Sequence, residues 1–276
     1  RNPITFDNWN NSKILAYWKY DDATKLGKDS HSWLGRLNNI RTALQGQQGD
    51  RRLRLGIAGG EWKKMMADAT ARTRFASEVK KIIEQYDFDG VDFDFEWPAN
   101  ASEYNNYSAT VIQMRSTLGK YVYFTASLHP VSFKISPEAI DALDFISYQC
   151  YGPAVMRFPY EQFVKDGEAA VAYGIPKNKL VMGVPFYGST GSLIAAYCDF
   201  VNDGLATTNE DTYTYKGNTY TFNSIETIRK KARYVCEEDY AGIMSWDLAT
   251  DIDITNNKSL LKVIKEEFEY YANPTE

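Results

Sequence analysis

Short apolar runs alternate with longer amphipathic stretches along most of this chain. The runs have the length and the β-branched or aromatic content of buried strands. They lie at Ile14–Lys19, Arg52–Ala58, Gly90–Glu96, Tyr121–Leu128, Phe145–Tyr151, Leu180–Tyr187 and Ala241–Trp246. Apolar residues spaced three or four apart predict helices between them, at Ser32–Gln45, Thr70–Tyr86, Glu103–Thr117, Glu161–Tyr173, Ser224–Glu238 and Ser259–Tyr270. This order predicts an α/β protein with a helix-covered parallel sheet, either doubly wound or closed as a (β/α)8 barrel.

One segment, 188–222, interrupts this alternation as a small insertion. Its run "TYTYKGNTYTF" predicts a hairpin that turns near Lys216-Gly217-Asn218. Seven strands can be assigned rather than eight, because residues 1–12 are too short for a full strand and helix. A barrel would therefore have its first strand missing or irregular, with Ile4–Phe6 as the candidate remnant. Since no linker is visible, we expect one domain over residues 1–276.

The run Gly90–Glu96 carries an acid on every second residue. In a strand, Asp92, Asp94 and Glu96 share one face, with successive Cβ atoms about 7 Å apart, while the phenylalanines between them point the other way. Glu96 comes last, at the carboxyl end of the strand, where barrel active sites form. Because neighbouring carboxylates repel, at least one of them holds its proton more tightly, as a general acid must.

Two other interpretations of these acids are open. A purely structural column of buried acids would need pairing or hydrogen bonds to offset its cost. A divalent-metal site would suit carboxylate oxygens, but the spacing does not match an EF-hand loop and no nucleotide motif accompanies it. We therefore expect no metal and no cofactor.

Composition narrows the functional class. The net charge is −5 with basic residues spread along the chain, which argues against a nucleic-acid binder. Aromatic residues make up 14% of the chain, as suits a carbohydrate binder as well as an aromatic core. No apolar run reaches the roughly 20 residues of a membrane span. Two histidines and three widely spaced cysteines argue against a zinc enzyme, a Ser-His-Asp triad and a disulfide framework.

Four segments resemble glycoside hydrolase family 18, the chitinases and related endo-β-N-acetylglucosaminidases. "DGVDFDFE" resembles the family signature Asp-Gly-x-Asp-x-Asp-x-Glu. "RLGIAGG", "LVMGVPFYG" and "AGIMSWDLATD" resemble its third, seventh and eighth strands, and Ile14–Lys19 then matches its second. The resemblance covers about residues 13–265 and implies a (β/α)8 barrel.

The resemblance also implies a mechanism, which is retaining hydrolysis of a β-1,4 bond next to N-acetylglucosamine. In this family the acetamido oxygen of the substrate is the nucleophile. By position, Glu96 would be the acid and then the base, Asp94 would orient the acetamido group and stabilise the oxazolinium ion, and Asp92 would share a proton with Asp94. In the third strand, Ile57 stands where a serine often supports the inner aspartate.

Further residues follow from the same resemblance. In "DFISYQCYG", Tyr151 falls on the tyrosine that holds the acetamido carbonyl, and Gln149 would share its face. A shifted alignment would give the role to Tyr148, which lies on the opposite face of a regular strand. Trp246 would support the sugar from below. Three more aromatic residues near strand ends could line the cleft or pack in the core: Trp18, Trp97 and Tyr187.

Three functions remain open at this point. The first is a glycosidase acting on chitin or chitooligosaccharides, and the second is an endo-β-N-acetylglucosaminidase acting on N-linked glycans. The third is a non-catalytic chitinase-like lectin, which the presence of Glu96 disfavours. For each we expect an N-acetylglucosamine-containing saccharide as partner, a monomer, and a secreted, periplasmic or cell-surface location, with the signal for export outside this sequence.

Overall fold

The computed structural model describes residues 33–44, 52–153 and 155–272, which divide into two compact units. The first unit takes the chain up to residue 126 together with residues 134–144, and the second takes residues 127–133 and everything from 145 onward. The predicted strand Ile14–Lys19, the remnant Ile4–Phe6 and Trp18 lie outside the described residues.

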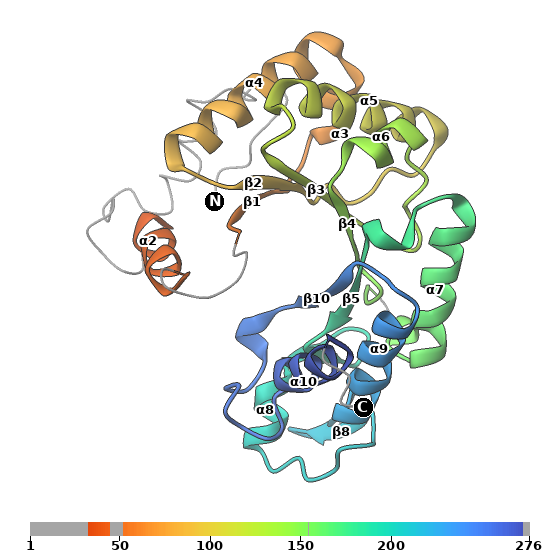
Figure 1. Ribbon diagram of the computed structural model, residues 1–276. Coiled ribbons are helices and arrows are strands. Elements are labelled where there is room, and N and C mark those ends of the chain that lie inside the picture. The colour runs from red at the N-terminus through yellow and green to blue at the C-terminus, as the bar shows by residue number, and fades with distance from the viewer. Residues whose placement is uncertain (1–32, 45–51, 154, 273–276) are drawn as a thin grey trace. The chain divides into compact units, whose positions relative to one another are not determined.

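The first unit contains three parallel strands and their helices (Figure 1). The strands are β1 (Arg54–Ile57), β2 (Gly90–Phe93) and β3 (Tyr123–Leu128), of which the last two residues count with the second unit. The helices are α2 (Trp33–Leu44), α3 (Trp62–Ala67), α4 (Ala69–Tyr86), α5 (Ala101–Leu118) and α6 (Pro137–Ala142). Gly90 permits the close approach of β2 to β3, since a Cβ there would clash with the carbonyl oxygen of Tyr123.

Helix α4 forms where the apolar period predicts it. The side chain of Asp68 accepts a hydrogen bond from the backbone N–H of Ala71 at 2.7 Å, which satisfies one of the open donors of the first turn. The apolar side of the helix, which includes Phe75, Val79 and Ile82, is fully buried. Burying such a face against a sheet is the main source of helix stability in a protein.

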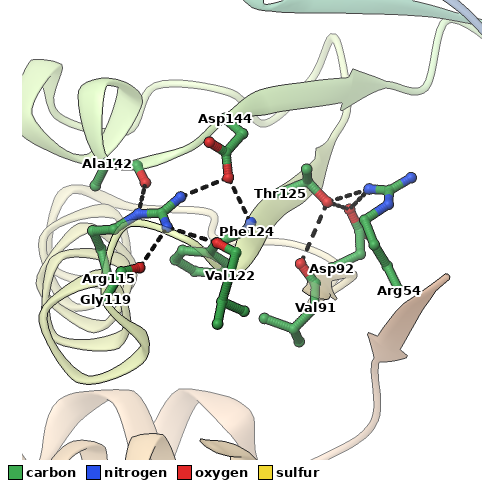
Figure 2. Close-up of polar contacts among 10 residues, drawn as sticks. All are labelled: Arg54, Val91, Asp92, Arg115, Gly119, Val122, Phe124, Thr125, Ala142 and Asp144. Atoms are coloured by element: carbon green, nitrogen blue, oxygen red, sulfur yellow. Dashed lines mark hydrogen bonds and ion pairs between the residues drawn. The ribbon is translucent and has the colours of Figure 1, made fainter. Parts of the chain in front are cut away.

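Helix α5 is tied to the start of β3 by Arg115 (Figure 2). The guanidinium donates to the backbone oxygens of Ala142 at 2.7 Å and Val122 at 2.8 Å, and it pairs with Asp144 at 2.7 Å. Asp144 in turn accepts from the backbone N–H of Phe124 at 2.7 Å. Because one arginine satisfies several backbone carbonyls, it fixes how the helix ends against the strand.

The second unit also contains a parallel β/α arrangement. Its parallel strands are β4 (Phe145–Tyr148), β5 (Leu180–Pro185) and β10 (Gly242–Trp246), with β5 in the middle. The helices and 3-10 turns that accompany them are η2 (Val155–Arg157), α7 (Tyr160–Tyr173), η3 (Lys177–Lys179), α9 (Ile225–Glu237), η4 (Leu248–Thr250) and α10 (Leu260–Ala272). In Figure 1, α9 and α10 lie side by side, and they pack against each other.

The insertion is more than the predicted hairpin. It holds β6 (Tyr187–Ser189), β7 (Ile194–Ala196), α8 (Tyr197–Asn202), β8 (Thr212–Tyr215) and β9 (Asn218–Thr221), and its strands form an antiparallel sheet in the order β7-β6-β9-β8. The hairpin itself is confirmed, because Tyr215 pairs with Asn218 across Lys216-Gly217. Both turn residues have positive φ, at 48° and 78°, as a two-residue turn of type I′ requires.

The predicted helices agree with the structure within a few residues, whereas several strands are shorter than predicted. β2 ends at Phe93 rather than Glu96, and the run Leu180–Tyr187 divides into β5 and the first residue of β6. The ladder nevertheless continues past β2, since the N–H of Asp94 donates to the oxygen of Ile57 at 2.9 Å. Within the described part of the chain, no helix is both long and apolar enough to cross a membrane.

Candidate active site

The acids of the first unit alternate with buried aromatic residues, as the pattern predicts. Val91, Phe93 and Phe95 are fully buried, and the ring centroids of the two phenylalanines lie 5.2 Å apart. Asp92 and Asp94 are half-buried and Glu96 is exposed. The carboxylates therefore become more accessible toward the carboxyl end of the strand, where a ligand outside the sheet could reach the last one.

Asp92, the innermost acid, is held by its neighbours on both adjacent strands (Figure 2). Arg54 of β1 forms an ion pair with Asp92 Oδ1 at 3.2 Å. The hydroxyl of Thr125 in β3 donates a short hydrogen bond to the same oxygen, and Arg54 also donates to that hydroxyl. Sequence reasoning missed both residues, although an arginine on the inner face of a predicted barrel strand was a visible signal.

Ile57, at the position where family 18 proteins often carry a supporting serine, does not lie beside Asp92. Ile57 pairs in register with Phe93, and Gly56 pairs with Asp92. Since paired residues of neighbouring strands point to the same side of a sheet, Ile57 belongs to the face of the phenylalanines and is buried there. The position beside Asp92 is a glycine without a side chain, and Arg54 together with Thr125 supplies the polar contacts instead.

Tyr107 of α5 approaches the acids from the helix side. It is fully buried, and its hydroxyl has no hydrogen-bond partner among the described residues. Burial raises the pKa of this phenol well above its ordinary value, and the nearby charges of Asp92 and Asp94 raise it further. Tyr107 therefore stays neutral. Trp62, which follows the glycines of "RLGIAGG", packs edge-on against Tyr107 and is a core residue.

In the second unit, Tyr148 and Tyr151 occupy different surroundings. Tyr148 is fully buried and packs edge-on against Phe133, with centroids 5.8 Å apart. The hydroxyl of Tyr151 lies 3.4 Å from the sulfur of Met244 in β10. A Cβ at Gly183 of β5 would lie 2.8 Å from the ring of Tyr151, so this glycine leaves room for it. These contacts favour Tyr151 over Tyr148 as the residue on the inner side of these strands.

The backbone at Tyr151 is held by His129. The Nε2 atom of His129 lies 3.0 Å from the carbonyl oxygen of Tyr151 and 2.8 Å from that of Gly152. Its Nδ1 atom accepts from the N–H of Val131 at 3.2 Å. The histidine is buried and hydrogen-bonded rather than solvated. Its partners at Nε2 are backbone carbonyls, which no pattern of side chains in the sequence could have indicated.

The remaining predicted sugar contacts differ in exposure. Gln149 is buried, and its backbone N–H donates to the carbonyl oxygen of Leu128 at 2.8 Å. Tyr187 stands edge-on to Tyr151 with centroids 6.4 Å apart, and burial raises its pKa to about 12. Trp246 is 54% exposed at the end of β10, so it is not a core residue. Trp97 is half-buried directly after Glu96.

The described residues bear on two chemical possibilities, a metal site and a disulfide. No three His, Cys, Asp or Glu side chains there form a group that could hold a metal ion. Cys150, Cys198 and Cys236 form no disulfide with one another. The chemistry that the described site offers is that of carboxylates, phenols and aromatic rings.

Comparison with known proteins gives consistent results. The model of the family described as glycosyl hydrolases family 18 matches residues 6–251. A probable chitinase 2 of Drosophila melanogaster is 23% identical over 297 residues, which cover 79% of this chain and 60% of that protein. The chain thus spans less than two thirds of this relative.

Two solved structures share the fold. A chitinase from Bacteroides thetaiotaomicron has a TM-score of 0.73 at 23% identity, over 87% of this chain and 82% of that one. A chitinase-like agglutinin from Robinia pseudoacacia has a TM-score of 0.71 at 18% identity, over 87% of each chain. The fold is therefore the TIM barrel that the sequence predicts, and the doubly wound alternative falls away. Since the family model matches most of the sequence, the chain belongs to glycoside hydrolase family 18, a family of chitinases and chitinase-like proteins.

Proposed function

We propose that this protein is a retaining glycosidase that hydrolyses β-1,4 bonds next to N-acetylglucosamine, in chitin or chitooligosaccharides. The observation that carries the proposal is the graded ladder of acids. Glu96 is exposed at its end, Asp94 and Asp92 are half-buried behind it, and the opposite face is closed by fully buried phenylalanines. A proton donor at the open end, with a second carboxylate beside it, is the arrangement that substrate-assisted hydrolysis needs.

In the proposed first step, the Glu96 carboxyl gives its proton to the glycosidic oxygen as that bond breaks. The acetamido oxygen of the sugar forms a bond to the anomeric carbon, which yields an oxazolinium ion and the free leaving group. Asp94 accepts the acetamido N–H and offsets the positive charge of the ion. In the second step, Glu96 takes a proton from water as the water oxygen opens the ring, so the anomeric configuration is retained.

The residues of the second unit take binding roles in this proposal. Tyr151 donates its hydroxyl to the acetamido carbonyl, Gln149 offers its amide to the sugar, and Trp246 presents an exposed ring face for a pyranose. The exposure of Trp246 supports its role, since a core tryptophan would be buried. Trp97 and Tyr187 are proposed as further wall residues. Trp18 keeps the same prediction, outside the described part of the chain.

Two alternatives have specific support. The pair Gln149 and Tyr151 is similar to that of plant-type chitinases and of some endo-β-N-acetylglucosaminidases, and it keeps open an activity on N-linked glycans. The likeness to the agglutinin of Robinia pseudoacacia supports a non-catalytic lectin, although the exposed Glu96 argues against it. Since chitin is a polymer, we also propose a secreted, periplasmic or cell-surface location for the enzyme. We propose separately that it acts as a monomer.

The test compares Glu96→Gln with the wild type on a chromogenic chitotriose glycoside and on an N-glycoprotein. Glutamine keeps the size of the side chain but cannot donate an acidic proton, so we expect kcat to fall by roughly a hundredfold or more while oligosaccharide binding remains. Glu84→Gln changes an exposed glutamate of α4 and is the matched control. Release from the glycoprotein alone would favour the second activity, and release from neither substrate by the wild type would favour the lectin.

A further inference from the structure

Arg54 is a charged residue to which the proposed mechanism assigns no role. It lies in β1, opposite Gly90 in the register and two residues before Gly56, the partner of Asp92. Its guanidinium therefore extends along the strand direction to reach the carboxylate, with which it pairs at 3.2 Å. The side chains of Arg54 and Asp92 are only 28% and 15% exposed, so the pair is screened less than a surface pair would be.

Two neighbouring side chains hold Asp92 at the same oxygen. Arg54 and the hydroxyl of Thr125 each reach Oδ1, and Arg54 also donates to that hydroxyl (Figure 2). Three groups from three strands thus form a closed triangle that fixes the rotation of the carboxylate. A carboxylate held this way by a charged donor and a hydroxyl is stabilised in its ionised form.

The neighbouring carboxylates act on Asp92 in the opposite direction. Asp94 follows on the same strand face, with Glu96 beyond it, and like charges favour protonation of one member. Tyr107 approaches from α5 and stays neutral, because its pKa is raised by burial and by the charges of Asp92 and Asp94. Arg54 is thus a cation placed to favour the ionised form of Asp92 against the repulsion of the neighbouring carboxylates.

We propose that Arg54 is a positioning residue that keeps Asp92 ionised and fixes the orientation of its carboxylate. This inference rests on the proposed function for its catalytic meaning, but not for the charge of Asp92. The family resemblance implies that Asp92 shares a proton with Asp94. With Arg54 in place, Asp92 would instead be a fixed anion, held at one oxygen by Arg54 and Thr125.

The experiment follows the titration of Asp92 directly. In protein with ¹³C-labelled aspartate carboxyl groups, the Asp92 signal is assigned by its loss in Asp92→Asn, and its midpoint is measured in Arg54→Met, Arg54→Lys and Thr125→Val. We expect the midpoint to rise by about one pH unit or more in Arg54→Met and to stay close to wild type in Arg54→Lys. The acidic limb of kcat/KM on the chitotriose glycoside should move up by a similar amount in Arg54→Met.

Arg52→Met is the matched control, since Arg52 lies two residues earlier and stacks over the ring of Tyr123 at 3.6 Å. It should leave both the midpoint and the pH profile unchanged. An Asp92 midpoint that is the same in wild type and Arg54→Met would overturn the inference. If Arg54→Met fails to fold, Arg54→Lys and Thr125→Val carry the test. Both keep a cation beside Asp92, and we expect a smaller rise of the Asp92 midpoint in Arg54→Lys than in Thr125→Val; a larger rise in Arg54→Lys would contradict a role for the charge pair.

The hydrolytic function and the role of Arg54 at Asp92 can be refuted independently. If wild-type protein releases no product yet the Asp92 midpoint depends on Arg54, the hydrolytic function is wrong and the charge assignment stands. If Glu96→Gln abolishes hydrolysis and the Asp92 midpoint ignores Arg54, the function stands and the inference is wrong.

Discussion

His129 shows how one buried residue can tie a site to pH. Both acceptors at its Nε2 atom are backbone carbonyls, those of Tyr151 and Gly152, so this nitrogen carries the proton. Its Nδ1 atom accepts from Val131 and must be unprotonated. Burial lowers the pKa of His129, and Arg157 lowers it further, against the opposing effects of the two carbonyls and of Asp166. The folded protein therefore holds this histidine in its neutral form.

This leads to a prediction about acid stability. In the unfolded chain His129 binds a proton near pH 6.5, whereas in the folded chain it does so only at lower pH. The contribution of His129 is therefore present above about pH 6.5 and is lost as the pH falls toward the folded-state pKa. We expect the free-energy difference of unfolding between wild type and His129→Gln to shrink below pH 6.5 by up to about 1.4 kcal/mol per pH unit. Urea denaturation of both proteins at pH 7.5 and pH 5 measures it, and a difference that is equal at the two pH values contradicts it.

At the scale of elements, β2 depends on its buried face. Phe93 is fully buried, and its ring contacts those of Phe75 in α4, Phe95 and Phe124 in β3. Phe93→Ala leaves a cavity that these rings cannot fill, so we expect it to lower the free energy of unfolding by about 3–5 kcal/mol. Ile112→Ala, at a residue of α5 that is 42% exposed, should cost far less. Urea unfolding compares them, and near-equal losses would refute this account of the packing.

The elements that could be predicted from the sequence are those that a pattern within one segment determines. The apolar side of α4, including Phe75 and Val79, follows from periodicity, and the alternation of acids and phenylalanines in β2 follows from the geometry of one strand. Arg54 and Thr125 could not be assigned to Asp92 in the same way, because they lie on neighbouring strands and their contact depends on register. A one-residue change of register would turn Arg54 away.

The other strands of the insertion were not predicted, for a related reason. Its hairpin was visible because Lys216-Gly217 forms a two-residue turn between alternating residues. The pairing of Ser189 with Thr221, which joins β6 to β9, spans a long stretch of chain and leaves no local signal. The break after Pro185 was missed for the same reason, since the apolar run continues unchanged into Tyr187.

At the scale of the whole molecule, one buried cation bears on global stability. Lys231 of α9 is fully buried and donates to the carbonyl oxygen of Phe158 and to Oδ1 of Asn223, each at 2.7 Å. Burial lowers its pKa from the ordinary value to about 7, although nearby groups, Cys150 first among them, act in the other direction. Near neutral pH, the unfolded chain therefore keeps Lys231 protonated, whereas the folded protein is protonated there in only part of its molecules.

The sign of the resulting pH dependence is fixed. Between about pH 7 and the ordinary lysine value near 10.4, the unfolded chain binds more protons at this site than the folded chain does, so the stability contributed by this site rises with pH. Relative to Lys231→Met, we expect the free energy of unfolding of the wild type to increase by up to about 1.4 kcal/mol per unit from pH 7 to pH 9. The slope is the quantity to measure, because methionine also leaves the Phe158 carbonyl and Asn223 without their donor. Lys230→Met, at the exposed neighbour, should follow the wild-type slope, and parallel curves for all three proteins would mean that Lys231 stays charged in the folded state.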